Sequence, residues 1–192
     1  MKKPALFLCM LLLWTACAGQ DLRPKQSYST YNSDQATGKW GYVNANTYGS
    51  GNWVIQPVFD YAESFYDGMA AVKIGSLWGF IDKKGQIVIP CQWESVGNFA
   101  DGLASVKKDG KWGAIDREGN TVVHFLYDYV AEFSKGYARV RLGDKWGFVN
   151  KQGTPVTETK YDKVSNFNGK FAKVKIGERN LKIDTTGKEY EK

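Results

Sequence analysis

The dipeptide Trp-Gly recurs along this 192-residue chain, and the repetition constrains the fold more than any other feature. It opens four units, at Trp40-Gly41, Trp78-Gly79, Trp112-Gly113 and Trp146-Gly147. The second and third units are each 34 residues long, and the first is 38 because four extra residues follow Gly41. A partial fifth unit begins at Asn180, where Asn-Leu replaces Trp-Gly. A fixed period of this length indicates a tandem array of one supersecondary unit.

Other positions keep the same register in every unit. A turn motif recurs at Asp82–Gly85, Asp116–Gly119, Asn150–Gly153 and Asp184–Gly187. An aromatic residue precedes an acid at Phe59-Asp60, Trp93-Glu94, Tyr127-Asp128 and Tyr161-Asp162. Conserved spacing also relates Phe65, Phe99, Phe133 and Phe167, and the pairs Ala70-x-Val72, Ala104-x-Val106, Ala138-x-Val140 and Ala172-x-Val174.

The content of the units favours strands over helices. Apolar residues alternate or form runs of four or five bounded by Gly turns, and no segment shows helical spacing over eleven residues. The chain holds seven Trp, eleven Tyr and ten Phe, which favour strands, and 21 Gly, which favour turns. The sequence therefore predicts an all-β fold.

Two kinds of turn predict how the strands pair. An Asp-x-x-Gly turn with a left-handed Gly predicts Ile81 opposite Ile87 and Phe80 opposite Val88. Two-residue turns before each Trp place Val72 opposite Gly79, Val106 opposite Gly113, and Val140 opposite Gly147. The same register predicts cation–π pairs between Lys73 and Trp78, Lys107 and Trp112, and Arg141 and Trp146.

The repeated Gly is expected to face Val and Ile on the inner side of the sheet, where a side chain would crowd its neighbours. Each unit is predicted to be a three-stranded antiparallel meander, joined to the next by a connector of about a dozen residues. Stacked meanders form a superhelical or solenoid-like array; a closed propeller- or barrel-like ring uses the same hairpins. Residues 180–192 form a half-repeat cap.

The units resemble the WG repeat, or KWG repeat, of bacterial proteins. The Lys-Trp-Gly core stands at Lys39–Gly41, Lys111–Gly113 and Lys145–Gly147, and Leu77 departs from it. The resemblance predicts a β-repeat domain over residues 39–192, with repeats at 40–77, 78–111, 112–145 and 146–179. It implies a β-rich array but no shared activity, ligand or catalytic residue.

The first 18 residues have the pattern of an export signal. Lys2 and Lys3 precede an apolar run from Ala5 to Trp14, which is shorter than the roughly 20 residues that span a bilayer. Cleavage before Gly19 would release a soluble periplasmic or secreted protein. Residues 15–17 also resemble a lipobox, in which Cys17 is lipidated and holds the protein at the periplasmic or outer membrane.

Residues 19–38 are polar and are expected to form a tether, within which Tyr28 to Asn32 can pair as a short strand. Cys9 and Cys17 fall in the leader, so Cys91 has no partner for an internal disulfide or a cysteine metal site.

The sequence offers no catalytic constellation, and we expect no enzyme activity, cofactor or metal. His124 is the only histidine, and the Gly residues follow hairpins without a phosphate-loop pattern. The charge of +6 falls when Lys2 and Lys3 are removed, and it is spread along the chain, which argues against nucleic-acid binding.

The acid row of Asp60, Glu94, Asp128 and Asp162 is expected to be structural, because an acid that opens a turn accepts backbone N–H bonds as an N-cap or Asx turn. A calcium ladder and a glycosidase pair are the alternatives.

The best candidates for a ligand or partner face are the repeated indoles of Trp40, Trp78, Trp112 and Trp146. Exposed indoles stack on sugars or pack on a partner; the structural alternative is that they seal the junctions between meanders. Trp53 and Trp93 are expected to be packing residues. The hypothesis is a non-enzymatic envelope module that binds an unknown protein. The alternative is a glycan- or peptidoglycan-binding module, and membrane contact is expected only through Cys17.

Overall fold

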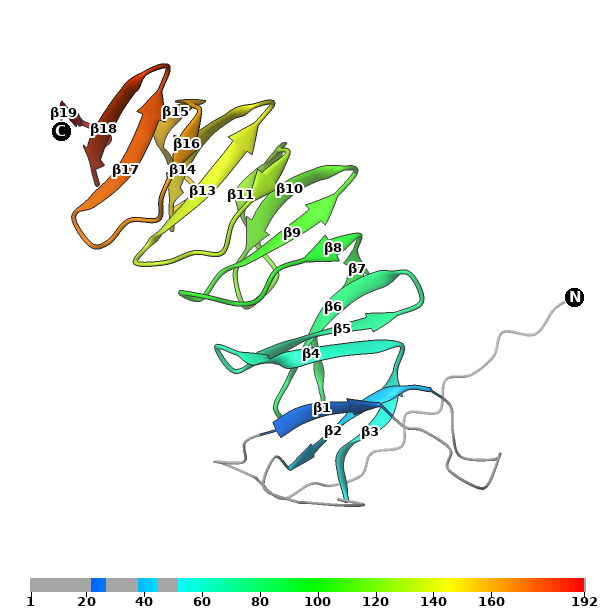
Figure 1. Cartoon of the computed structure of the whole chain (residues 1–192). Helices are drawn as coiled ribbons and strands as arrows, with labels where there is room; N and C mark the ends of the chain where they lie inside the picture. The colour runs from blue at the N-terminus through cyan, green and yellow to red at the C-terminus, as the bar shows by residue number, and fades with distance from the viewer. Residues whose placement is uncertain (1–21, 27–37, 45–51, 192) are drawn as a thin grey trace, which may run out of the picture.

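The computed structural model describes residues 22–26, 38–44 and 52–191, and all regular elements in these ranges are strands (Figure 1). The leader, Cys17 and the segment from Tyr28 to Asn32 lie outside the described residues. The strands form five separate antiparallel sheets in chain order.

The first sheet has three strands and the others have four. The first contains β1 (Leu22–Gln26), β2 (Trp40–Asn44) and β3 (Trp53–Phe59). The second contains β4 (Tyr61–Tyr66), β5 (Met69–Ile74), β6 (Leu77–Asp82) and β7 (Ile87–Trp93). The third contains β8 (Ser95–Val96), β9 (Ala104–Lys108), β10 (Lys111–Ile115) and β11 (Thr121–Tyr127). The fourth contains β12 (Tyr129–Val130), β13 (Tyr137–Leu142), β14 (Lys145–Asn150) and β15 (Pro155–Tyr161). The fifth contains β16 (Lys163–Val164), β17 (Phe171–Ile176), β18 (Arg179–Asp184) and β19 (Glu189–Glu191).

The predicted three-stranded meander is present, but part of each connector adds a further edge strand. Directly after the acid, the chain pairs with the Ala-x-Val strand, as Ser95 opposite Lys107 and Val96 opposite Val106 show for β8. These edge strands are as short as two residues in β8, β12 and β16. So short a run carries no periodicity in the sequence.

The expectation of an unstructured polar tether was wrong for Leu22–Gln26. These residues form β1, with Lys25 opposite Gly41 and Gln26 opposite Trp40. In the other sheets the Ala-x-Val strand occupies this position, as Val72 opposite Gly79 shows. Strand β1 therefore completes the first repeat, although only Leu22 of its five side chains is buried.

The hairpin before each Trp has the predicted register. Val72, Val106 and Val140 lie opposite Gly79, Gly113 and Gly147. The Asp-x-x-Gly turn is also as predicted: Gly85 has a φ of 80°, and Asp82 Oδ1 accepts the N–H of Gln86 at 2.9 Å.

Beyond that turn, the register prediction was wrong. Ile81 lies opposite Ile87, but Phe80 lies opposite Ile89 in place of Val88, and Trp78 lies opposite Trp93. Bulges in β7 thus add residues opposite Gly79. The first, third and fourth sheets show the same register shifts.

The bulge explains the invariant Gly. A Cβ on Gly79 would lie 2.5 Å from Ile89 O and 2.7 Å from Cys91 N. The close approach was predicted, but the crowding atoms belong to the backbone of the next strand and not to inner-face side chains. The bulged strand crosses directly over the position where a side chain would stand.

The sheets stack face to face, and each junction holds an apolar core. On β6, Phe80 faces the third sheet and contacts Phe99 at 4.8 Å between ring centroids, whereas Ile81 faces the first sheet. Tyr42–Phe65 and Phe148–Phe167 repeat the ring contact at 4.9 and 5.0 Å.

The array is open across the residues that the structure describes. Its first and last sheets lie at opposite ends (Figure 1), so the superhelical arrangement is confirmed and the ring alternative is not adopted there. The half repeat supplies β18 and β19 to the last sheet, with Leu181 and Ile183 buried against the fourth.

Replacing Gly79 with Ala is expected to lower the free energy of unfolding by about 1–3 kcal/mol, because the new methyl overlaps backbone that cannot rotate away. Urea denaturation measures the change. Ser76→Ala, in the exposed turn of the same sheet, is the control. A Gly79→Ala protein as stable as wild type would contradict the bulge argument.

Candidate functional site

The acid row forms clamps between successive sheets. Asp128 follows β11, yet its Oδ2 accepts the N–H of Gly143 in the hairpin of the next sheet at 2.7 Å. Its Oδ1 accepts a hydrogen bond from Lys111 Nζ at 2.6 Å. One carboxylate therefore joins the Lys of its own Lys-Trp-Gly motif to the following sheet.

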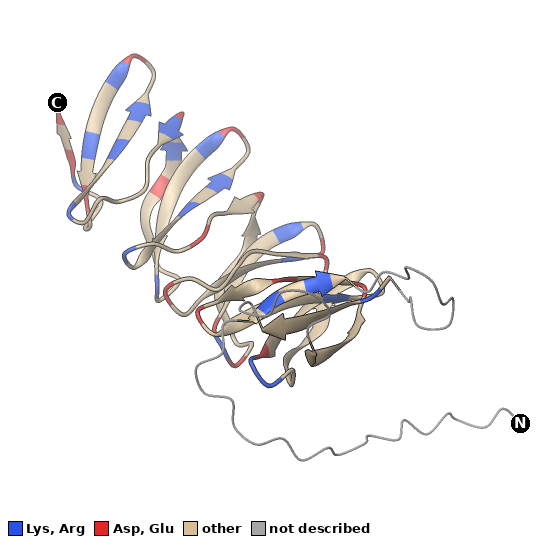
Figure 2. Cartoon of the chain, turned by 60° about the horizontal axis from the view of Figure 1, so that its bottom comes forward, with Lys and Arg blue, Asp and Glu red and all other residues tan. Residues whose placement is uncertain are grey.

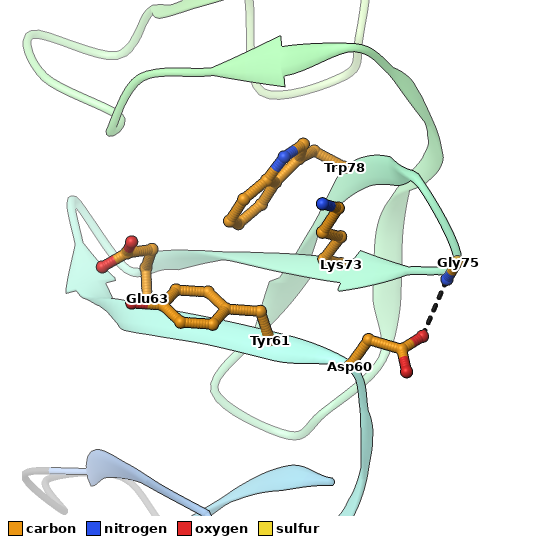
Figure 3. A pocket seen from close by; sticks show the side chains of 6 residues that line it. All are labelled: Asp60, Tyr61, Glu63, Lys73, Gly75 and Trp78. Carbon is orange, nitrogen blue, oxygen red and sulfur yellow. Dashed lines mark hydrogen bonds between the residues drawn. The ribbon is translucent and has the colours of Figure 1, made fainter.

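The same clamp recurs in two other repeats. Asp162 binds Lys145 Nζ at 2.5 Å and the N–H of Gly177 at 2.7 Å. Asp60 binds Lys39 and the N–H of Gly75, the latter at 2.7 Å (Figure 3). The acids accept backbone N–H bonds as expected, but the expected local cap was wrong, since each donor lies 15 residues further on.

The second repeat departs from the motif at both positions of the clamp. Leu77 replaces the Lys, and the acid is Glu94. Glu94 reaches the N–H of Gly110 with both oxygens, at 3.2 and 3.3 Å, and its cation is Lys107 at 4.0 Å. The longer side chain matches the different position of its cation.

The clamp lowers the pKa of each aspartate. The hydrogen bond from Lys111 is the largest cause for Asp128, followed by the N–H of Gly143. The pKa values of Asp60 and Asp162 fall below the usual 3.8 for the same reasons. The ionised form is favoured because both partners donate to it.

The four repeat tryptophans are half-buried along the junctions. Tyr61 lies between Trp40 and Trp78, with ring centroids 4.9 and 5.7 Å away. Tyr129 lies between Trp112 and Trp146 at 5.9 and 6.1 Å. These six side chains are called the aromatic row.

The sequence analysis missed Tyr61 and Tyr129. They follow the clamp acid in the first and third repeats, where Ser95 and Lys163 stand in the others. A position that is aromatic in alternate repeats was the available signal. Both tyrosines stay exposed, at 40% and 39%.

Cations cover part of the indole surface. Lys73 Nζ lies 5.7 Å from the Trp78 ring centroid and Arg141 Cζ lies 5.8 Å from that of Trp146. These contacts confirm two of the three predicted pairs. Lys107 has the predicted register against Trp112 but turns to Glu94.

A groove of about 630 Å³ opens beside the aromatic row (Figure 3). Its lining includes the rings of Tyr61 and Trp78, the ammonium of Lys73, and the carboxylates of Asp60 and Glu63. The groove thus offers apolar rings together with charges of both signs, which suits a polar chain with some apolar surface.

The remaining candidates lie elsewhere. His124 is exposed on β11, and Trp53 is half-buried on β3. Trp93 is buried and stacks on Phe125 at 5.6 Å. Cys91 is half-buried, which raises the pKa of its thiol. The described ranges contain no group of three side chains able to hold a metal ion.

Across those same ranges, no helix has the length and apolar character needed to cross a membrane.

Fold and site together define a tandem β-repeat domain of the kind that serves as a binding module. The family model of the WG containing repeat matches residues 40–78, 78–112, 112–146 and 146–179. The chain belongs to this family.

Solved structures with some similarity include Hsv2 of Kluyveromyces lactis (complete loop 6CD), at 12% identity and a TM-score of 0.46, covering 80% of this chain and 57% of that one. HIRA(644-1017) gives 6% and 0.38, with coverages of 90% and 53%. A eukaryotic initiation factor gives 12% and 0.45, with coverages of 88% and 62%. This chain spans less than two thirds of each. No curated protein matches its sequence.

Acid is expected to weaken the clamps. Because the pKa values of Asp60, Asp128 and Asp162 are lowered on folding, their stabilisation is complete above the unfolded pKa and is lost as the pH falls through the folded values. Urea midpoints of the wild type should therefore drop below pH 3.8.

The triple variant Asp60→Asn, Asp128→Asn, Asp162→Asn tests this expectation. It should have a lower midpoint at neutral pH and a shallower decline in acid. Glu63→Gln, which changes a groove carboxylate outside the clamps, should keep the wild-type decline. An equally steep decline in the triple variant would sink the assignment.

Removal of Tyr129 is expected to uncover its neighbours in the aromatic row. Tyr129→Ala deletes the ring between Trp112 and Trp146, so iodide should quench a larger fraction of the tryptophan fluorescence. Tyr66→Ala, which removes an exposed ring outside the row, is the control. Equal quenching in both variants would show that Tyr129 does not shield the indoles.

Proposed function

We propose that this chain is a non-enzymatic interaction or scaffold module of the bacterial cell envelope, which binds other proteins along its aromatic row. The observation that carries the proposal is the half-buried, interleaved arrangement of Trp and Tyr along several sheets. Such a surface presents ring edges and grooves to a partner. Protein interfaces favour this composition, because Tyr, Trp and Arg are enriched at their centres.

The same arrangement favours a protein partner over a sugar. Stacking on a sugar requires an open ring face. In the first groove, the Trp78 ring has Lys73 on it and Tyr61 against it edge to face. Trp146 carries both Arg139 and Arg141. The indoles therefore have little free face for a pyranose ring.

The geometry of the acids supports a non-enzymatic role. A glycosidase requires two carboxyl groups free to exchange protons or attack substrate. Asp60, Asp128 and Asp162 each bind a Lys and a backbone N–H. Both contacts hold the carboxylate ionised and occupied.

Glycan or peptidoglycan binding is the second candidate. The observation in its favour is the first groove, where Tyr61 and Trp78 stand beside the carboxylate of Glu63. Aromatic rings with acceptor oxygens are suited to sugar hydroxyls.

The export pattern places the proposed module outside the cytoplasm. We propose lipidation at Cys17 and location as a periplasmic or outer-membrane lipoprotein, with a soluble periplasmic or secreted form as the alternative. Membrane contact is then made through the anchor alone, and the partner is an envelope protein.

Site-specific photo-cross-linking of the full chain in intact bacteria tests the proposal. A photoreactive amino acid at Tyr61 should capture a discrete protein, and the capture should fall in a folded Trp78→Ala background. The same group at Lys84, in an exposed turn outside the row, should not capture it. Equal capture from both positions would refute a specific protein interface.

Co-sedimentation with peptidoglycan sacculi tests the second candidate. Sedimentation of wild-type protein that is lost in folded Trp78→Ala, together with absence of the protein cross-link, would replace the protein-binding proposal with wall binding. Tyr66→Ala is the matched aromatic control.

A further inference from the structure

A second cleft along the aromatic row has features that the repeat does not require. It lies where the third, fourth and fifth sheets meet and has a volume of about 310 Å³. Gly97, Ser105 and Trp112 of the third sheet and Tyr129, Glu132 and Arg139 of the fourth are among its lining residues. This volume is at the lower end of the range for ligand sites, roughly 300–1,000 Å³, and suits a single side chain with its backbone.

Arg139 departs from the repeat. The equivalent positions, 34 residues apart, hold Ala71, Ser105 and Lys173. Ala71 and Ser105 are buried, so the array folds with a small residue at this point. An arginine here is not explained by the packing that the other repeats show.

Small side chains in the third sheet open the space in front of Arg139. Ser105 lies opposite Ala114, whereas the equivalent partners of Ala71 and Arg139 are Phe80 and Phe148. A Cβ on Gly97 would collide with Ser105 Oγ. The hollow beside Trp112 thus arises from a combination found in this repeat and not in the second or fourth.

The positive charge in the cleft lacks an ionic partner. Arg139 and Arg141 both lie over Trp146, with Cζ 5.7 and 5.8 Å from the ring centroid. In the part of the chain that the structure describes, neither forms a salt bridge, and the Nε atoms of both are buried without a hydrogen-bond partner. Asp128 is close enough for Arg141 to lower its pKa, but its oxygens are bound to Lys111 and Gly143.

The surrounding sheets reinforce this field. Residues 135–191 contain 13 Lys and Arg against seven Asp and Glu, whereas residues 52–134 contain seven against 11. Figure 2 shows the basic residues on the strands of the last sheets. An acidic group is therefore attracted to the C-terminal half of the array.

Glu132 makes the cleft selective. It lines the same space and accepts a hydrogen bond from Asn98 Nδ2 at 3.1 Å. A polyphosphate would be repelled by this carboxylate. A peptide places a side-chain carboxylate against Arg139 and backbone N–H groups towards Glu132.

We infer that this cleft binds an Asp or Glu side chain of the partner, with Arg139 as the cation and Trp112 and Tyr129 as apolar walls. The inference rests on the proposed protein-binding function and specifies its chemistry. An Arg–carboxylate pair supplies charge-assisted hydrogen bonds that an uncharged amide does not.

Titration with short peptides, followed by ¹⁵N NMR of the full chain, tests the inference. The probes are acetyl-Gly-Glu-Gly-amide and the uncharged acetyl-Gly-Gln-Gly-amide. Saturable shifts of the Arg139 Nε–H and the Trp112 indole N–H are expected with the Glu peptide, at an affinity about tenfold or more above that for the Gln peptide. Arg139→Ala should abolish the difference, and Arg139→Lys should retain part of it.

Lys73→Ala removes a cation from the first groove and is the matched control, which should keep the wild-type preference. Equal shifts with both peptides, no shifts, a preference that survives Arg139→Ala, or tighter binding of inorganic pyrophosphate than of the Glu peptide would each overturn the inference.

Cross-linking separates this inference from the proposed function. Capture from Tyr61 that persists unchanged in Arg139→Ala, together with no peptide preference, would remove the carboxylate site and leave the protein-binding module. Absence of capture from Tyr61 in the wild type would refute the module itself, whatever the peptides do.

Discussion

The missing side chain after each Trp is the constraint on which the array depends. At Gly79 the bulged backbone of β7 passes within 2.5 Å of the place where a Cβ would stand. The bulge sets the register of the third and fourth strands of each sheet and increases their local twist. Because the same crossing occurs at Gly41, Gly113 and Gly147, every sheet has the same shape, and identical sheets can stack in series.

Two sets of contacts then fix how one sheet lies on the next. Phe80 against Phe99 and the equivalent ring pairs fill the centre of the junction. At its margin, a clamp acid such as Asp128 holds the hairpin of the following sheet through Gly143. The ring contacts are non-directional, whereas the clamp specifies which hairpin is bound. The combination makes a stiff array from meanders that cannot bury their own faces alone.

Specificity in such an array comes from departures from the repeat. The invariant positions are occupied in building the junctions, and the Trp–Lys or Trp–Arg contacts belong partly to this framework. Tyr61, Tyr129 and Arg139 vary between repeats and lie beside the grooves. They distinguish one junction from another, and this difference is what a partner protein is able to recognise.

The sequence by itself determined the all-β repeat, the Val–Gly hairpin register and the Asp-x-x-Gly turns, because these follow from local spacing and backbone preference. It also located the Trp positions and the acid row. Only the tertiary structure decided that β7 bulges over Gly79, that Leu22–Gln26 completes the first sheet, and that Asp128 binds the next hairpin and not its own turn. These features join segments of different sheets or strands, so their energies depend on packing between parts of the chain that local sequence patterns do not relate.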